Sequence, residues 1–322
     1  MNSKVSLQQL KQQSGMRMRI SAIGLTAAAT LAILGATFVP TSLLAKTPPE
    51  VTLTVTVGGA KSIPTLTASN FVVTDHGQMQ NVQVLAGPPL QSPLHVALVV
   101  EEGTAPSLNN QLANLRRFIE QLPAGTDVMI ATIDRNHANL VVPFTTDLRR
   151  AANSISILKD VPSEVPLSAF VSLSDVIGRF KGLDGRKEIV MVGPGYDTLQ
   201  EEISPSSNMD LQQAERKARE ENVVVHTIWV PSAVPFSRLF DLSGSSNMAD
   251  LAEATGGLSF WNIDRSVVQD LTARLNTIQE AFNQQYVLRF TPDIPFNQSH
   301  NIRVKLKDVQ EANEIKVNFP KR

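Results

Sequence analysis

The chain has 322 residues and a hydrophobic content of 42%, which is enough for a packed core and excludes a disordered protein. A formal net charge of −1 without a basic cluster argues against a nucleic-acid-binding protein. The chain contains no cysteine, so disulfides and lipid attachment through cysteine are excluded.

Residues 1–45 have the composition of an export signal. They contain four basic residues and no acidic residue, and residues 20–45 carry no charge. The apolar stretch is nearly long enough to cross a bilayer, so a cleaved signal peptide and an uncleaved N-terminal membrane anchor both stay open. Pro40 and the small residue Ala45 favour cleavage, which would leave a net charge of about −5. Either alternative places the rest of the protein outside the cytoplasm, in the periplasm or outside the cell.

Residues 50–90 are expected to form a small β segment. Residues 51–57, "VTLTVTV", alternate Val and Leu with Thr, which is the period of a half-buried strand. Two further strand-like runs surround a turn at Asp75, His76 and Gly77.

Residues 93–283 have the pattern of an α/β domain. Residues 94–100, "LHVALVV", form an uninterrupted apolar run, typical of a parallel strand buried on both faces. Residues 107–122 place apolar side chains at helical spacing, with Ser107 as the expected cap. Residues 243–247, "SGSSN", are predicted to be a flexible loop, and a long helix is expected over residues 266–285. Strands separated by helices favour a parallel sheet with right-handed crossovers.

Residues 284–320 return to strand patterns, and the simplest packing places them with residues 50–90. The predicted fold class is therefore a doubly wound, mainly parallel α/β sheet flanked by helices. The N-terminal and C-terminal segments are expected to form one small antiparallel β module beside it.

Several segments in the right order resemble one known family. They are "ASNFVVTDHGQMQNV", "PLHVALVVE", "LPAGTDVMIATID", "GRKEIVMVGPGYDT", "LAEATGGLSFW" and "FNQQYVLRFTP". These segments resemble the von Willebrand factor A related domain of exported bacterial proteins, best known from acidobacteria, over about residues 51–320. The resemblance implies a protein-interaction or adhesion domain of the metal-ion-dependent type with a flanking β module.

The resemblance also implies where a metal site would lie. The family builds it from an Asp-x-Ser-x-Ser loop after the first core strand, a Thr from a second loop and an Asp after a later strand. Here Glu101 stands at the first Asp, and Gly103 and Ala105 stand at the two serines. A shift by one residue places Glu102 and Thr104 there instead and recovers one hydroxyl.

The other two positions also differ from the family. Ser168 matches the Thr and keeps a hydroxyl, Pro194 replaces the distal Asp, and Asp197 matches a secondary acid. We expect no metal and no cofactor, with both glutamates solvated at the strand end. The alternatives are contact of these acids with a basic partner, or a non-standard Mg²⁺ or Ca²⁺ site, which would use Glu101, Glu102, Thr104, Ser168 and Asp197.

A Pro-rich insertion, residues 229–244, offers a contact patch through Phe236 and Phe240, unless both side chains fold back on the core. With Glu101 and Glu102 they are the candidate partner-binding residues.

The predicted function is an exported, non-enzymatic protein-interaction or adhesion module with a degenerate metal site. Its partner is expected to be a cell-envelope protein, and only the N-terminal segment is expected to contact a membrane. One alternative is a cation-dependent adhesion domain. The other is an envelope hydrolase, which the sequence does not favour because the five histidines show no metal spacing and no serine lies in a Gly-x-Ser-x-Gly context.

Overall fold

The computed structural model describes residues 50–59, 64–88, 91–104, 106–156, 168–197, 207–232, 238–261, 268–293, 300–309 and 315–321. The chain from Thr47 to Arg322 forms one compact unit. Within the described ranges, no helix is long and apolar enough to cross a membrane. The expected export signal, residues 1–45, lies outside them.

A six-stranded sheet in the order β10-β9-β8-β5-β6-β7 forms the centre of the α/β domain. Its neighbouring strands pair in parallel, except that β7 pairs antiparallel with β6. The strands are β5 (Leu94–Glu101), β6 (Asp127–Asp134), β7 (His137–Thr145), β8 (Arg186–Gly193), β9 (Val223–Trp229) and β10 (Ser259–Phe260).

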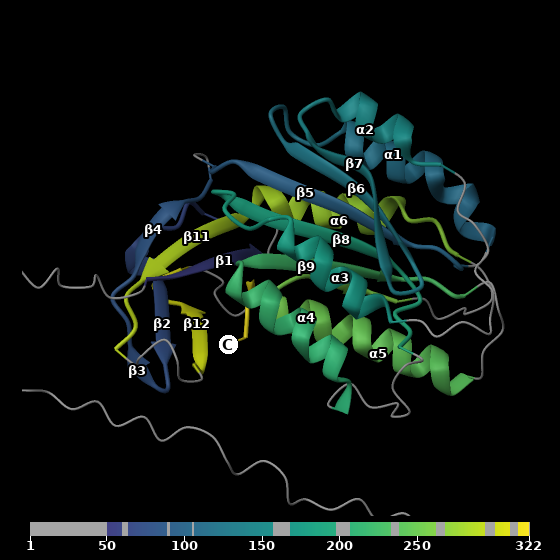
Figure 1. Ribbon diagram of the computed structural model, residues 1–322. Coiled ribbons are helices and arrows are strands. Elements are labelled where there is room, and N and C mark those ends of the chain that lie inside the picture. The colour runs from purple at the N-terminus through teal and green to yellow at the C-terminus, as the bar shows by residue number, and fades with distance from the viewer. Residues whose placement is uncertain are drawn as a thin grey trace, which may run out of the picture. The chain divides into compact units, whose positions relative to one another are not determined.

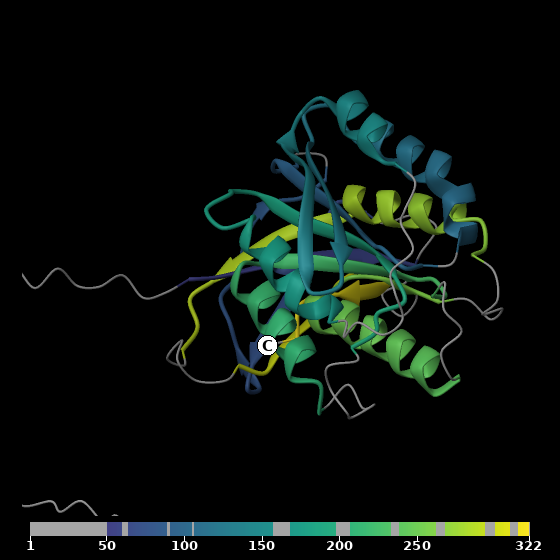
Figure 2. The ribbon, with the colours of Figure 1, turned by 45° about the vertical axis from the view of Figure 1, so that its right-hand side comes forward.

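Helices cover both faces of this sheet (Figures 1 and 2). Successive side chains of a strand point to opposite faces, so Val96 and Leu98 of β5 pack in one apolar core and Ala97 and Val99 in the other. The first core includes α1 (Leu112–Glu120), α2 (Leu148–Ser154) and α6 (Thr272–Asn283). The second includes α3 (Ala169–Gly178), α4 (Met209–Glu220) and α5 (Arg238–Thr255).

The β module combines strands from both ends of the chain, and β1 and β11 lie side by side (Figure 1). Its two antiparallel sheets have the orders β13-β1-β11-β4 and β12-β2-β3. The strands are β1 (Val51–Gly58), β2 (Phe71–Asp75), β3 (Gln78–Met79), β4 (Gln83–Ala86), β11 (Gln285–Phe290), β12 (Ile302–Leu306) and β13 (Lys316–Asn318). The predicted fold class, a doubly wound, mainly parallel sheet flanked by helices with an antiparallel β module built from the N-terminal and C-terminal segments, is confirmed.

Three local expectations were wrong. The segment 243–247 is helical, because α5 begins at Arg238 and packs Met248 and Leu251 into the core. The segment before α1 is a 3-10 helix, Pro106–Gln111, and the Ser107 hydroxyl accepts a hydrogen bond from the Val268 N–H (3.1 Å) instead of capping α1. The last helix, α6, begins only at Thr272.

A buried polar network joins the β module to the central sheet. Glu188 is fully buried; one carboxylate oxygen contacts His226 Nε2 (2.9 Å) and the other accepts a hydrogen bond from Gln285 Nε2 (2.8 Å). Because His226 Nδ1 accepts a hydrogen bond from the Leu258 N–H (3.1 Å), the proton of a neutral ring lies on Nε2 and is donated to Glu188. Arg186 donates to Gln285 Oε1 (3.3 Å); burial lowers the pKa of Arg186, and Glu188 opposes that shift.

Replacement of Gln285 by Met should destabilise the protein. The Gln285→Met variant leaves the Glu188 carboxylate without one of its donors, and loss of a hydrogen bond to a buried charged group costs about 1–3 kcal/mol. Urea unfolding, followed by the fluorescence of the buried Trp229, measures the change. Gln213→Met, on the exposed face of α4, is the control, and equal losses in both variants would contradict a special role for Gln285.

Candidate functional site

The candidate site lies where the parallel core strands end, and its centre is a buried glutamate. Glu101 is the last residue of β5 and only 5% exposed, so the expectation that it is solvated was wrong. Its carboxyl oxygens accept a hydrogen bond from the Gly195 N–H (3.2 and 3.3 Å). A Cβ at position 193 would overlap the Glu101 carboxyl group, so Glu101 can take this position only beside a glycine.

Burial decides the charge of Glu101. Removal from water disfavours a carboxylate and raises the pKa of Glu101 from 4.5 to about 8, although the hydrogen bond from Gly195 lowers it in part. The folded protein therefore holds Glu101 mainly as a neutral acid at pH 7.

Little space is left beside this carboxyl group. Glu101, Glu102, Pro194 and Tyr196 line a cavity of about 20 Å³, which is room for about one water molecule. Magnesium in proteins usually keeps several waters in an octahedral shell. Pro194 has no side-chain oxygen, and its carbonyl accepts a hydrogen bond from Trp229 Nε1 (3.1 Å).

Glu102 and Thr104 have partners other than Glu101. Glu102 is half-buried, and its carboxylate accepts a hydrogen bond from the Thr132 hydroxyl (3.0 Å) on β6. Thr104 forms an isolated β-bridge with Ser232. Its hydroxyl is buried and has no hydrogen-bond partner among the described residues.

Ser168 and Asp197 belong to a second polar group. Ser168 is fully buried, and its hydroxyl lies 3.2 Å from Asp197 Oδ2 and 3.0 Å from Asp210 Oδ2. A hydroxyl has one proton, so it donates to one of these carboxylates at a time. The sequence interpretation missed Asp210; the available signal was an acid in the first turn of α4, after the N-cap Asn208.

The predicted site residues are thus divided among several local groups. In the described ranges, no cluster of three or more His, Asp or Glu side chains is placed to hold a metal. Phe236 lies outside the described residues. Phe240 lies on α5, where its side chain is also outside the description.

No protein-family model matches the chain, and no curated protein matches it. Among solved structures it is similar to the conserved hypothetical protein BatB from Bacteroides thetaiotaomicron, with a TM-score of 0.44, 13% identity, and 58% of this chain and 96% of that chain covered. It is also similar to the ArnB paralog VWA2 from Sulfolobus acidocaldarius, with a TM-score of 0.40, 12% identity, and 84% of this chain and 76% of that chain covered. It is similar as well to von Willebrand factor type A from Catenulispora acidiphila, with a TM-score of 0.42, 10% identity, and 86% of this chain and 74% of that chain covered. At these identities the likeness concerns the fold alone.

Replacement of Glu101 by Gln should remove a pH dependence of stability. Between about pH 4.5 and pH 8 the folded wild type holds a proton on Glu101 that the unfolded chain has released. Folding stability of the wild type therefore falls as pH rises through this window, by on the order of 5 kcal/mol from this group. Glu101→Gln cannot ionise, so its stability should not fall through this window and should exceed that of the wild type at pH 8.

Urea unfolding at pH 5, 6, 7 and 8 measures this difference. Glu102→Gln, a change of the neighbouring half-buried carboxylate, is the matched control and should keep the slope of the wild type. A Glu101→Gln protein with the slope of the wild type would show that Glu101 is ionised in the folded state.

Proposed function

We propose that the chain is an exported protein-interaction module that binds an envelope protein at the carboxyl ends of its core strands without a bridging cation. The observation that carries this proposal is the burial of Glu101 against Gly193 and Gly195. The export signal expected at residues 1–45 supports a location outside the cytoplasm.

Three properties of the site support the absence of a cation. A carboxyl group with a pKa of about 8 has to lose its proton before it binds a metal at neutral pH. The cavity of about 20 Å³ beside it is too small for a hydrated ion. Pro194, where the family that the chain resembles has an Asp, brings no carboxylate.

The same edge of the sheet presents apolar side chains to solvent. Met209, in the first turn of α4, is 71% exposed, and Val171, in the first turn of α3, is 37% exposed. The contact of Ser168 with Asp210 joins the beginnings of these two helices. Apolar groups beside acids suit a protein surface that combines apolar and basic residues. Glu101 is buried, so Glu102 is the acid of the pair that a partner can reach.

A second candidate function, cation-dependent adhesion, is favoured by one observation. Two carboxylates, Asp197 and Asp210, lie within 3.2 Å of the Ser168 hydroxyl. Carboxylate and hydroxyl oxygens are ligands that hard cations accept. Such a site would differ from the one implied by the resemblance, because it would include Asp210 and exclude Glu101.

We propose no catalytic activity. A nucleophilic serine needs a base that takes its proton and a group that orients the base. The Ser168 hydroxyl contacts two carboxylates, those of Asp197 and Asp210. His226 is fully buried, and both of its ring nitrogens form hydrogen bonds, one with Glu188 and one with the Leu258 N–H.

Calorimetric titration of the full-length protein with Mg²⁺, Ca²⁺ and Mn²⁺ separates the two candidates. We expect no saturable heat at millimolar metal, because Glu101 is protonated and the space beside it is small. Saturable binding that is lost in Asp197→Asn but kept in Glu101→Gln would establish the second candidate instead. Binding lost in Glu101→Gln would contradict the protonated, cation-free site.

Replacement of Met209 by Asp should weaken partner capture. Crosslinking in intact envelopes, with and without a metal chelator, compares the wild type with Met209→Asp. We expect the same crosslinked species in both conditions for the wild type and at least a ~tenfold weaker one for the variant, since an exposed apolar contact worth about 1.4 kcal/mol is replaced by a charge. Met79→Asp is the control, because Met79 is equally exposed but lies on β3 of the β module. Capture that the chelator abolishes, or that both variants weaken equally, would contradict the proposal.

A further inference from the structure

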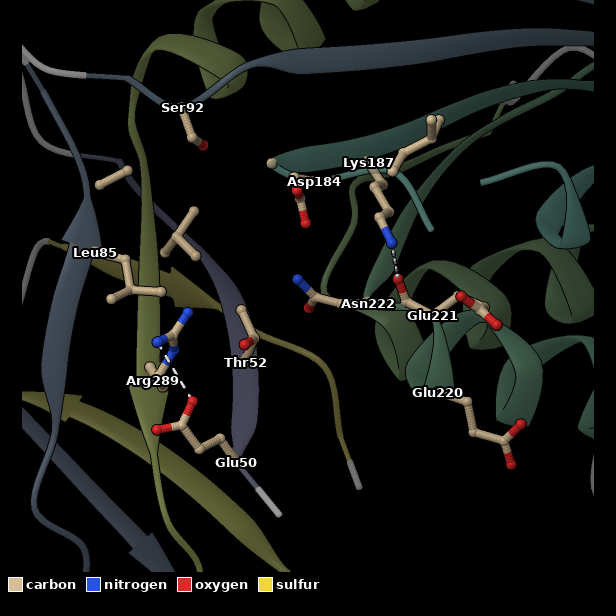
Figure 3. Close-up of a pocket in the computed structure, with 14 residues that line it drawn as sticks. Glu50, Thr52, Leu85, Ser92, Asp184, Lys187, Glu220, Glu221, Asn222 and Arg289 are labelled. Atoms are coloured by element: carbon tan, nitrogen blue, oxygen red, sulfur yellow. Dashed lines mark hydrogen bonds and ion pairs between the residues drawn. The ribbon is translucent and has the colours of Figure 1, made fainter. Parts of the chain in front are cut away.

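A large cavity lies at the opposite ends of the core strands from Glu101. It measures about 580 Å³ and lies between the β module and the loops that lead into β8 and β9 (Figure 3). Leu85 and Arg289 line it on the side of the module, and Asp184, Lys187 and Glu221 face them across the cavity. Cavities of about 300–1,000 Å³ are typical of sites for small ligands.

One wall of the cavity is apolar. Leu85 on β4 is 44% exposed, although it is a large aliphatic residue, and it lies beside Ala86 on the same strand. Val287 of β11 pairs with Ala86 and extends the wall. An aliphatic chain placed along this wall would remove apolar surface of Leu85 from water.

Among the charged residues of the lining, acids outnumber bases. Four acidic residues line the cavity, Glu50, Asp184, Glu220 and Glu221, against the two bases Lys187 and Arg289. Arg289 forms an ion pair with Glu50 (3.3 Å). The lining carries an excess of two negative charges, so its field favours a positively charged ligand.

Lys187 shows how this field acts on an ammonium group. It is about nine-tenths buried, and its Nζ donates to the Glu221 carbonyl oxygen (3.1 Å). Burial lowers the pKa of Lys187, whereas the charges of Glu221 and Asp184 raise it. The pKa of Lys187 is lowered overall, so the two carboxylates offset only part of the cost of burying an ammonium group at this end of the cavity.

We propose that this cavity binds an alkylammonium group, the chemistry of a lysine side chain on an extended partner segment or of a free aliphatic diamine. The ligand's methylene stem lies along Leu85, Ala86 and Val287, and its ammonium head lies at Asp184. Lysine side chains divide in this way between apolar and polar surroundings, since the stem is apolar and only the head is charged. This site is separate from the proposed partner-binding edge, so either proposal can fail without the other.

Calorimetric titration of the full-length protein tests the ligand chemistry. The probes are N-acetyl-lysine methylamide, 1,5-diaminopentane and, as the control, N-acetyl-norleucine methylamide, which has an aliphatic side chain without the ammonium group. We expect the lysine probe to bind at least ~tenfold more tightly than the norleucine probe, because a charge-assisted contact supplies about 1.4 kcal/mol or more. Binding of the diamine as well would show that the free amine suffices, whereas binding of the lysine probe alone would identify a peptide source.

Two variants with opposite expected effects test the position of the ammonium head. Asp184→Asn should weaken binding of the lysine probe at least ~threefold, because its carboxylate is lost. Lys187→Met removes a competing cation of similar length and should strengthen binding. Asp175→Asn, on the exposed face of α3, is the matched control and should leave binding unchanged.

Equal affinity of the lysine and norleucine probes, or binding of neither, would overturn the proposal. So would unchanged affinity in both Asp184→Asn and Lys187→Met, provided that urea unfolding shows both variants to be folded.

Discussion

The position of the β module against the central sheet depends on the pairing of one buried carboxylate, that of Glu188. Glu188 is buried near the amino end of β8, an inner strand of the central sheet, and an ionised group without partners there would cost several kcal/mol. Its partners come from two sides: His226 from the neighbouring strand β9, and Gln285 from the first position of β11. Because β11 is also the strand next to β1, satisfying Glu188 holds the β module at the amino ends of the core strands. The large cavity lined by Leu85 and Lys187 is a consequence of this position.

Glu101 is also buried, but the cost of burying its carboxyl group is avoided in a different way. Glu101 has one backbone donor, Gly195, and the large rise in its pKa is due to burial. It therefore keeps its proton, which makes it neutral at pH 7, whereas Glu188 is held by an imidazole and an amide. The contrast explains why one acid can stabilise the junction between two parts of the protein and the other can occupy a small cavity without an ion.

Much of the fold could be predicted from local patterns. Uninterrupted apolar runs identified the core strands, and strand patterns at both ends of the chain indicated the shared module. Helix α5 was underestimated because "SGSSN" has loop composition, and only tertiary contacts such as the burial of Asn247 favour a helix there. The burial of Glu101 could not be predicted, because it depends on the missing Cβ of Gly193, 92 positions farther along the chain. Asp210 was missed for the same reason, since its contact with Ser168 spans 42 positions.

The exchange of one acid for a longer one has consequences for any cation at this edge. Glutamate carries one more methylene than the aspartate of the family that the chain resembles, so the carboxyl group of Glu101 reaches the backbone at Gly195. A metal would have to compete with a proton there: with a pKa of about 8, only about one tenth of the protein carries the anion at pH 7, which alone weakens apparent affinity about tenfold. It would also have to break the contact with Gly195 and find other oxygens, because Pro194 supplies none from its side chain. A proton on Glu101 therefore makes cation binding at this position less favourable, and the charged side chains that line the cavity beside it are those of Glu102 and Arg135.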